Sequence, residues 1–118
     1  MDHEMTLDEL AKEIKEVSDE RLLQDLARYI EEWKSDDRNV EALEKMVERF
    51  FGNVWIPGEE DHLRAYRTWT SFRDDAIRGI GGMTMNERLY AFGLFDRYDS
   101  CETETARRVI YGKVHAKP

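Results

Sequence analysis

Apolar side chains recur at three- and four-residue intervals along most of this chain, and this spacing constrains the fold more than any other feature. The first apolar stripe follows the segment TLDE, in which Thr6 and Glu9 can cap each other's backbone N–H groups at a helix start. The segment TMNE repeats this capping pattern with Thr84 and Glu87. The spacing and the two caps together predict an all-α fold.

The same pattern predicts five to six helices in one compact bundle. The expected helices cover about residues 7–17, 19–33, 40–51, 59–80, 85–98 and 103–111. Short connections between them favour antiparallel neighbours. The end of the last segment, residues 111–115, is either helical or an extended tail.

Two segments depart from a simple amphipathic pattern. Residues 52–58 read GNVWIPG, and because Pro57 and Gly58 break helices, this segment is expected to be a non-helical link. It is also a candidate hinge between residues 1–51 and 59–118 within a single domain. Residues 85–98 carry apolar side chains nearly all round the expected helix, as a helix does when it is central to a core or covered by a partner.

Size and composition exclude several classes of protein. A chain of 118 residues with 41% hydrophobic residues suits one domain with one core. No apolar run approaches the ~20 residues of a membrane-spanning helix, and the acidic N-terminus lacks the pattern of a secretory signal. A single cysteine, Cys101, cannot form an internal disulfide. We therefore expect a soluble, cytoplasmic protein with no membrane partner.

The formal net charge of −8 is unevenly distributed. Residues 1–61 sum to −11 and residues 62–118 to +3, and eight of the ten bases in the second half are arginine. Either the acidic half packs against the Arg-rich half, or an acidic surface meets a basic protein, or the chain associates head to tail. Arginine and aromatic residues alternate over residues 64–73, but the net negative charge works against phosphate contacts. No nucleic-acid partner is expected.

Two segments in the last third of the chain resemble a set of short, uncharacterised bacterial helical proteins. Residues 86–90 read NERLY and residues 93–99 read GLFDRYD, similar to the N-E-R-L-[FY] and G-L-x-D-x-[FY]-D segments of that set. The resemblance implies a helix–turn–helix unit here. It brings no known activity, so no catalytic residue is carried over. The present chain adds about eighty residues in front, and we look for its function in that added part.

The residue types that most often bind metals or act as nucleophiles are scattered. His3, His62 and His115 include no pair four residues apart, which a helical zinc site needs. Cys101 stands among acidic residues, which disfavour the reactive thiolate. The sequence therefore predicts no catalytic residue, no resident metal and no cofactor.

Four aspartates support a different hypothesis, a cation-dependent enzyme. Asp74 and Asp75 are adjacent, and Asp96 and Asp99 stand about one helical turn apart. Paired carboxylates can hold a divalent cation or transfer protons. The alternative, which the neighbouring arginines favour, is that these carboxylates form structural ion pairs.

Trp55 is the strongest candidate for a partner contact, because it lies in the non-helical link just before three acids. Tryptophan is enriched among the residues that dominate binding energy at protein interfaces. The other interpretation is that Trp55 folds back and plugs the bundle. The predicted partner-binding residues are Trp55, Glu59, Glu60, Asp61, Asp36 and Asp37.

From these observations we predict that the protein is a small acidic module that binds or inhibits a basic protein. An immunity- or antitoxin-like role fits its size and acidity by analogy of type only. The alternative function is a homo-oligomeric structural protein, motivated by the apolar helix expected over residues 85–98. The cation-dependent enzyme is the third hypothesis.

Overall fold

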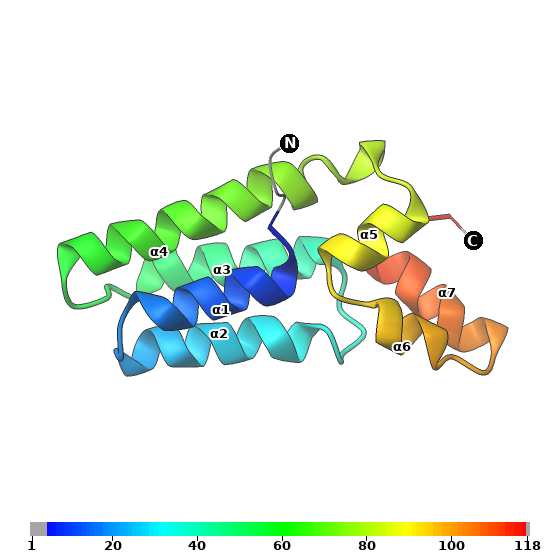
Figure 1. Cartoon of the computed structure of the whole chain (residues 1–118), viewed down its shortest axis with the longest axis horizontal. Coiled ribbons are helices and arrows are strands. Elements are labelled where there is room, and N and C mark those ends of the chain that lie inside the picture. The colour runs from blue at the N-terminus through cyan, green and yellow to red at the C-terminus, as the bar shows by residue number, and fades with distance from the viewer. Residues whose placement is uncertain (1–4, 118) are drawn as a thin grey trace.

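The computed structural model describes residues 5–117, and α-helices account for most of them (Figure 1). The helices are α1 (Leu7–Val17), α2 (Arg21–Trp33), α3 (Val40–Asn53), α4 (Glu59–Phe72), α5 (Met85–Ala91), α6 (Phe95–Asp99) and α7 (Glu104–Lys113). A π turn (Arg73–Ile77) and a 3₁₀ turn (Ile80–Gly82) connect α4 to α5. The all-α class is confirmed. The expected five to six helices were too few, since the described residues form seven.

Helices α1 to α4 run along the long axis, each antiparallel to the next, and the short helices α5 to α7 gather at one end (Figure 1). Helix α1 packs against both α2 and α4, and α2 packs against α3. The molecule measures 46 × 30 × 21 Å along its principal axes. The α1–α2 and α3–α4 connections both lie at the end of the long axis opposite α7 (Figure 1).

Both predicted capping boxes are present. The Thr6 hydroxyl accepts from the backbone N–H of Glu9 at 3.2 Å, and the Glu9 carboxylate accepts from the N–H of Thr6 at 3.1 Å. Thr84 and Glu87 form the same reciprocal pair at 3.1 and 2.9 Å. Helices α1 and α5 begin one residue after these threonines, so the local sequence fixes both starts.

One hydrophobic core joins the α1–α4 bundle to the C-terminal helices. Buried apolar residues between Leu7 and Val114 belong to a single cluster, with contributions from both sides of the α3–α4 link. Phe92 lies at the junction, its ring centroid 5.7 Å from that of Trp33 and 5.7 Å from that of Phe72. All three aromatic side chains are buried, so the C-terminal segment completes the core of the bundle.

The prediction of a single apolar helix over residues 85–98 is wrong. Helix α5 ends at Ala91, and α6 begins at Phe95 after a turn through Gly93, whose φ is +66°. This left-handed conformation favours glycine and ends a helix. The turn at Gly93 explains why apolar residues occur on every side of the expected helix. Because the chain changes direction there, Leu89 before the turn and Leu94 after it are both buried.

The expected fourth helix, residues 59–80, is also interrupted. Helix α4 ends at Phe72, and the chain continues as a π turn before the 3₁₀ turn. Leu63 in the first half of α4 is 40% exposed although it is apolar. The buried side chains of α4 are those of His62, Ala65, Trp69 and Phe72.

The non-helical link is shorter than the expected residues 52–58. Helix α3 continues through Gly52 and Asn53, and Val54 is its C-cap. Glycine stops a helix when it takes the left-handed conformation, and among the described glycines Gly58 and Gly93 have a positive φ whereas Gly52 does not. The link therefore comprises residues 54–58.

Candidate functional site

Trp55 projects from the α3–α4 link with 64% of its surface exposed. One face of its indole stacks on the imidazole of His62, with ring centroids 4.1 Å apart and planes 20° from parallel. The neighbouring Ile56 is fully buried. Ile56 thus anchors the link in the core, in the role that one interpretation gave to Trp55, and Trp55 is a surface residue supported from one side.

His62 organises the link from the first turn of α4. Its Nδ1 accepts a hydrogen bond from the backbone N–H of Ile56 at 3.1 Å, which selects the neutral tautomer with its proton on Nε2. The edge of the imidazole packs against Phe51, with centroids 5.8 Å apart. From the sequence, His62 was a candidate metal ligand, and its structural role was not predicted. Its place on the buried stripe, directly after an apolar link, is the signal that could have identified it as a support for Trp55.

The first turn of α4 presents three carboxylates beside Trp55. Gly58 enters the helix with a φ of +90° and offers no side-chain cap, so the acids complement the positive end of the helix dipole. Glu59 and Glu60 are exposed and Asp61 is half-buried. Within residues 5–117, none of the three forms an ion pair. Their charge is therefore directed at solvent.

Further carboxylates lie at the same end of the molecule. Asp19 and Glu20 belong to the α1–α2 connection, which shares this end of the long axis with the α3–α4 link (Figure 1). They are far from Trp55 in sequence, and only the antiparallel packing of the helices places them there.

Asp36 and Asp37, the other predicted partner-binding residues, lie at the opposite end and are engaged within the chain. Arg97 donates to the Asp37 carboxylate at 2.8 Å. Arg38 donates to Asp36 at 2.7 Å. Burial by itself raises the pKa of the Asp36 carboxyl, but hydrogen bonds from Arg38 and Lys113 outweigh it and leave the pKa below its ordinary value. Both carboxylates thus help dock the C-terminal helices.

Lys113, at the end of α7, is the charged residue that sequence reasoning missed. Its side chain is fully buried, and Nζ donates to the carbonyls of Trp33, Asp36 and Arg38 and to the Asp36 carboxylate at 3.1 Å. Nζ also lies 3.7 Å from the centroid of the Trp33 ring. Burial lowers the pKa of Lys113 to about 8, against the opposing effect of Asp36. These contacts fasten α7 to the loop after α2.

Two of the four aspartates of the enzyme hypothesis, Asp74 and Asp75, lie in the π turn after α4. Asp74 pairs with Arg73 at 3.0 Å and with Arg78 at 3.4 Å. Asp96 and Asp99 lie on the short helix α6. Among the described residues, no group of three or more His, Cys, Asp or Glu side chains could hold a metal ion. The structure therefore adds no support to a cation-dependent mechanism.

The remaining candidate metal-binding or nucleophilic residues are His3, His115 and Cys101. His3 lies outside the described residues. His115 is exposed just beyond α7. The Cys101 thiol donates to the carbonyl of Arg97 at 3.3 Å, a local contact that follows α6.

Comparison with protein-family models, with curated proteins and with solved structures finds no match to this chain. In the part of the chain that the structure describes, no helix has the length and apolar character needed to cross a bilayer. A function for this protein therefore has to be argued from its own geometry, and the α3–α4 link offers the clearest starting point.

Proposed function

We propose that this protein is a small acidic binding module that docks a basic protein through Trp55 and the carboxylates of Glu59, Glu60 and Asp61. The observation that carries the proposal is an exposed tryptophan, stacked on a buried histidine, beside three carboxylates that pair with nothing in residues 5–117. Inhibition of the partner, as in immunity proteins or antitoxins, and a cytoplasmic location belong to the same proposal.

Trp55 supplies the apolar part of the contact. Its stacking on His62 restricts the ring before binding, which reduces the entropy that association costs. The exposed face of the indole remains free to enter a pocket on a partner, the usual position of residues that dominate interface energy.

The carboxylates supply the electrostatic part. Exposed charges on a rim chiefly accelerate encounter with an oppositely charged surface, and salt weakens the effect. The overall charge of −8 acts in the same direction. It also favours a basic protein over nucleic acid, whose phosphates it repels.

The test begins with affinity recovery from lysate of the source organism, run in parallel with the unchanged protein and with Trp55→Ala at low and high salt. A basic protein that is lost with Trp55→Ala and at high salt is then purified for kinetic measurements. Recovery of the same proteins by both forms would contradict the proposed site.

Kinetics then separate the two contributions. Trp55→Ala should speed dissociation by roughly thirtyfold, the value of about 2 kcal/mol at an interface anchor, with little change in association. Glu60→Lys should slow association and reduce its salt dependence. The matched control is Glu41→Lys, in the exposed first turn of α3 at the other end of the long axis, which should leave the association rate nearly unchanged.

The homo-oligomer alternative has a narrower basis than the sequence suggested. The apolar helix that motivated it is two helices, and three of its large side chains, Leu89, Phe92 and Leu94, are buried in the core. Tyr90 and Phe95 remain exposed, at 54% and 38% of their surfaces. Sedimentation velocity at increasing protein concentration tests this alternative, because self-association would raise the sedimentation coefficient.

A further inference from the structure

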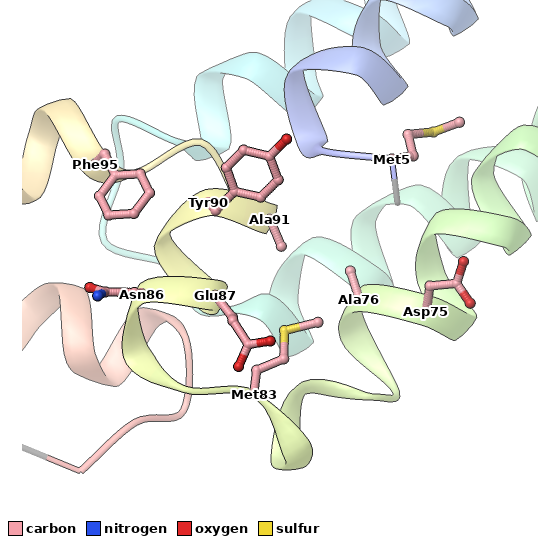
Figure 2. A pocket seen from close by; sticks show the side chains of 9 residues that line it. All are labelled: Met5, Asp75, Ala76, Met83, Asn86, Glu87, Tyr90, Ala91 and Phe95. Carbon is pink, nitrogen blue, oxygen red and sulfur yellow. The ribbon is translucent and has the colours of Figure 1, made fainter. Parts of the chain in front are cut away.

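A hollow of about 350 Å³ opens between the start of α1, the π turn and helices α5 and α6 (Figure 2). This volume lies in the range of ligand pockets, ~300–1,000 Å³. The site is separate from the Trp55 surface, because α5 and α6 lie at the other end of the long axis (Figure 1). No role proposed so far uses it.

Small residues leave this space open. The methyl groups of Ala76 and Ala91 face each other across it (Figure 2), and both residues are almost completely buried. Met5 and Met83 lie on two other sides. Methionine side chains are flexible and polarisable, so they can adjust to ligands of different shape.

Aromatic rings line the α5–α6 side of the hollow. Tyr90 and Phe95 both contribute to its lining, and both belong to the few large hydrophobic side chains that are exposed in residues 5–117. Aromatic faces attract apolar groups and also cations, through the negative charge of their π systems.

The charged lining residues in the described part of the chain are both acidic. Asp75 stands on the π-turn side of the hollow (Figure 2) and is exposed, and its carboxylate has no hydrogen bond or ion pair with another described residue. Glu87 contributes a second carboxylate, which caps α5. The hydrogen bond from the backbone of Thr84 holds the pKa of the Glu87 carboxyl below its ordinary value, so it is ionised at neutral pH. Among residues 5–117, no cationic side chain lines the hollow.

We propose that this hollow binds a small amphiphilic cation, an aryl- or alkylammonium whose apolar body lies between Ala76, Ala91 and Tyr90 and whose ammonium group pairs with Asp75. Complementarity of charge selects this ligand over fatty acids and other amphiphilic anions. The Asp75 carboxylate gains a partner that residues 5–117 do not supply, and the exposed aromatic rings lose contact with water.

The test is a titration of the full-length, ¹⁵N-labelled protein with 2-phenylethylammonium, followed by amide chemical shifts. 2-Phenylethanol and 3-phenylpropionate serve as neutral and anionic comparators of similar shape. The expected result is that shifts concentrate at the lining residues and that affinity falls in the order ammonium, alcohol, carboxylate.

Two pairs of variants localise the contacts. Asp75→Asn should weaken ammonium binding about threefold to fivefold, the range of an exposed ion pair, and should leave the alcohol unaffected. Asp99→Asn, the same charge change outside the lining, should alter neither. Tyr90→Ala should weaken both probes, whereas Tyr29→Ala, an exposed tyrosine on α2, should alter neither. A merely disturbed fold would weaken both probes in Asp75→Asn.

Several outcomes would overturn the proposal. They are an absence of shifts up to the solubility of the ammonium probe, equal or tighter binding of the carboxylate, and an unchanged ammonium-to-alcohol ratio in Asp75→Asn. Shifts of the lining amides on raising the protein concentration alone would show that a second copy fills the hollow. Equal shifts with ammonium chloride would show that the apolar body contributes nothing.

Discussion

At the scale of single residues, Lys113 shows how one buried charge can direct the docking of a segment. Its ammonium group donates to the backbone carbonyls of Trp33, Asp36 and Arg38 and to the Asp36 carboxylate, at the end of α2 and in the loop that follows. A buried cation is tolerated only when its donors are matched in this way. Lys113 therefore determines where α7 packs and also stabilises that packing.

Replacing Lys113 with Met keeps an unbranched side chain, one atom shorter, but removes every donor. The carbonyls around Nζ would then be buried without partners, and we expect Lys113→Met to lower the free energy of unfolding by about 3 kcal/mol. Urea denaturation measures the change. Lys117→Met, at an exposed position, is the control and should stay within about 0.5 kcal/mol of the unchanged protein. Equal effects of the two substitutions would show that the buried contacts contribute little.

The unchanged protein and Lys113→Met should also differ in how their free energy of unfolding depends on pH. Because the pKa of Lys113 falls from 10.5 to about 8 on folding, the unfolded chain binds more protons than the folded one between these values. Stability from this group therefore rises with pH across that window. The difference between the unchanged protein and Lys113→Met should grow by about 1–3 kcal/mol from pH 7.5 to 10.5. A constant or narrowing difference in urea denaturation would contradict the lowered pKa.

At the scale of elements, two glycines have opposite roles. Gly93 takes a φ of +66° between α5 and α6, and an added Cβ would lie 2.8 Å from the Asp8 carboxylate. Gly52 lies within α3, and its added Cβ would meet nothing within 4 Å. The first glycine is required for the turn, whereas the second only weakens a helix.

We therefore expect opposite signs from two alanine substitutions. Gly93→Ala should destabilise the protein by about 1–2 kcal/mol, because a non-glycine residue is strained at positive φ. Gly52→Ala should stabilise it by about 0.5–1 kcal/mol. Thermal unfolding followed by circular dichroism compares the two directly. A stabilised Gly93→Ala would mean that residues 85–98 can form the continuous helix expected from the sequence.

At the scale of the whole molecule, the aromatic contacts of Phe92 make the C-terminal helices part of the bundle core. Phe92→Ala should cost about 3–5 kcal/mol, as expected for a fully buried phenylalanine. Since Phe92 contacts Trp33 and Phe72, unfolding followed by tryptophan fluorescence and by circular dichroism should shift together. Separate transitions by the two probes would show instead that the bundle and the C-terminal helices unfold independently.

Much of the secondary structure could be predicted because its causes are local. The helical spacing of apolar residues and the reciprocal caps at Thr6 and Thr84 act within one or two turns, and the structure contains both. Where the prediction was wrong, at Gly52 and Gly93, the local signals were ambiguous. Glycine ends a helix only when the surrounding packing selects a positive φ.

The features of the candidate site can also be separated into those with local causes and those that depend on tertiary packing. The sequence alone determined that an apolar link carrying Trp55 precedes an acidic helix start, since both features are contiguous. Only the tertiary structure decided that Ile56 turns inward and Trp55 outward, because the choice depends on His62 and the space beneath the link. Likewise, the burial of Lys113 depends on backbone oxygens up to 80 residues away, and no local pattern specifies which charge will meet them.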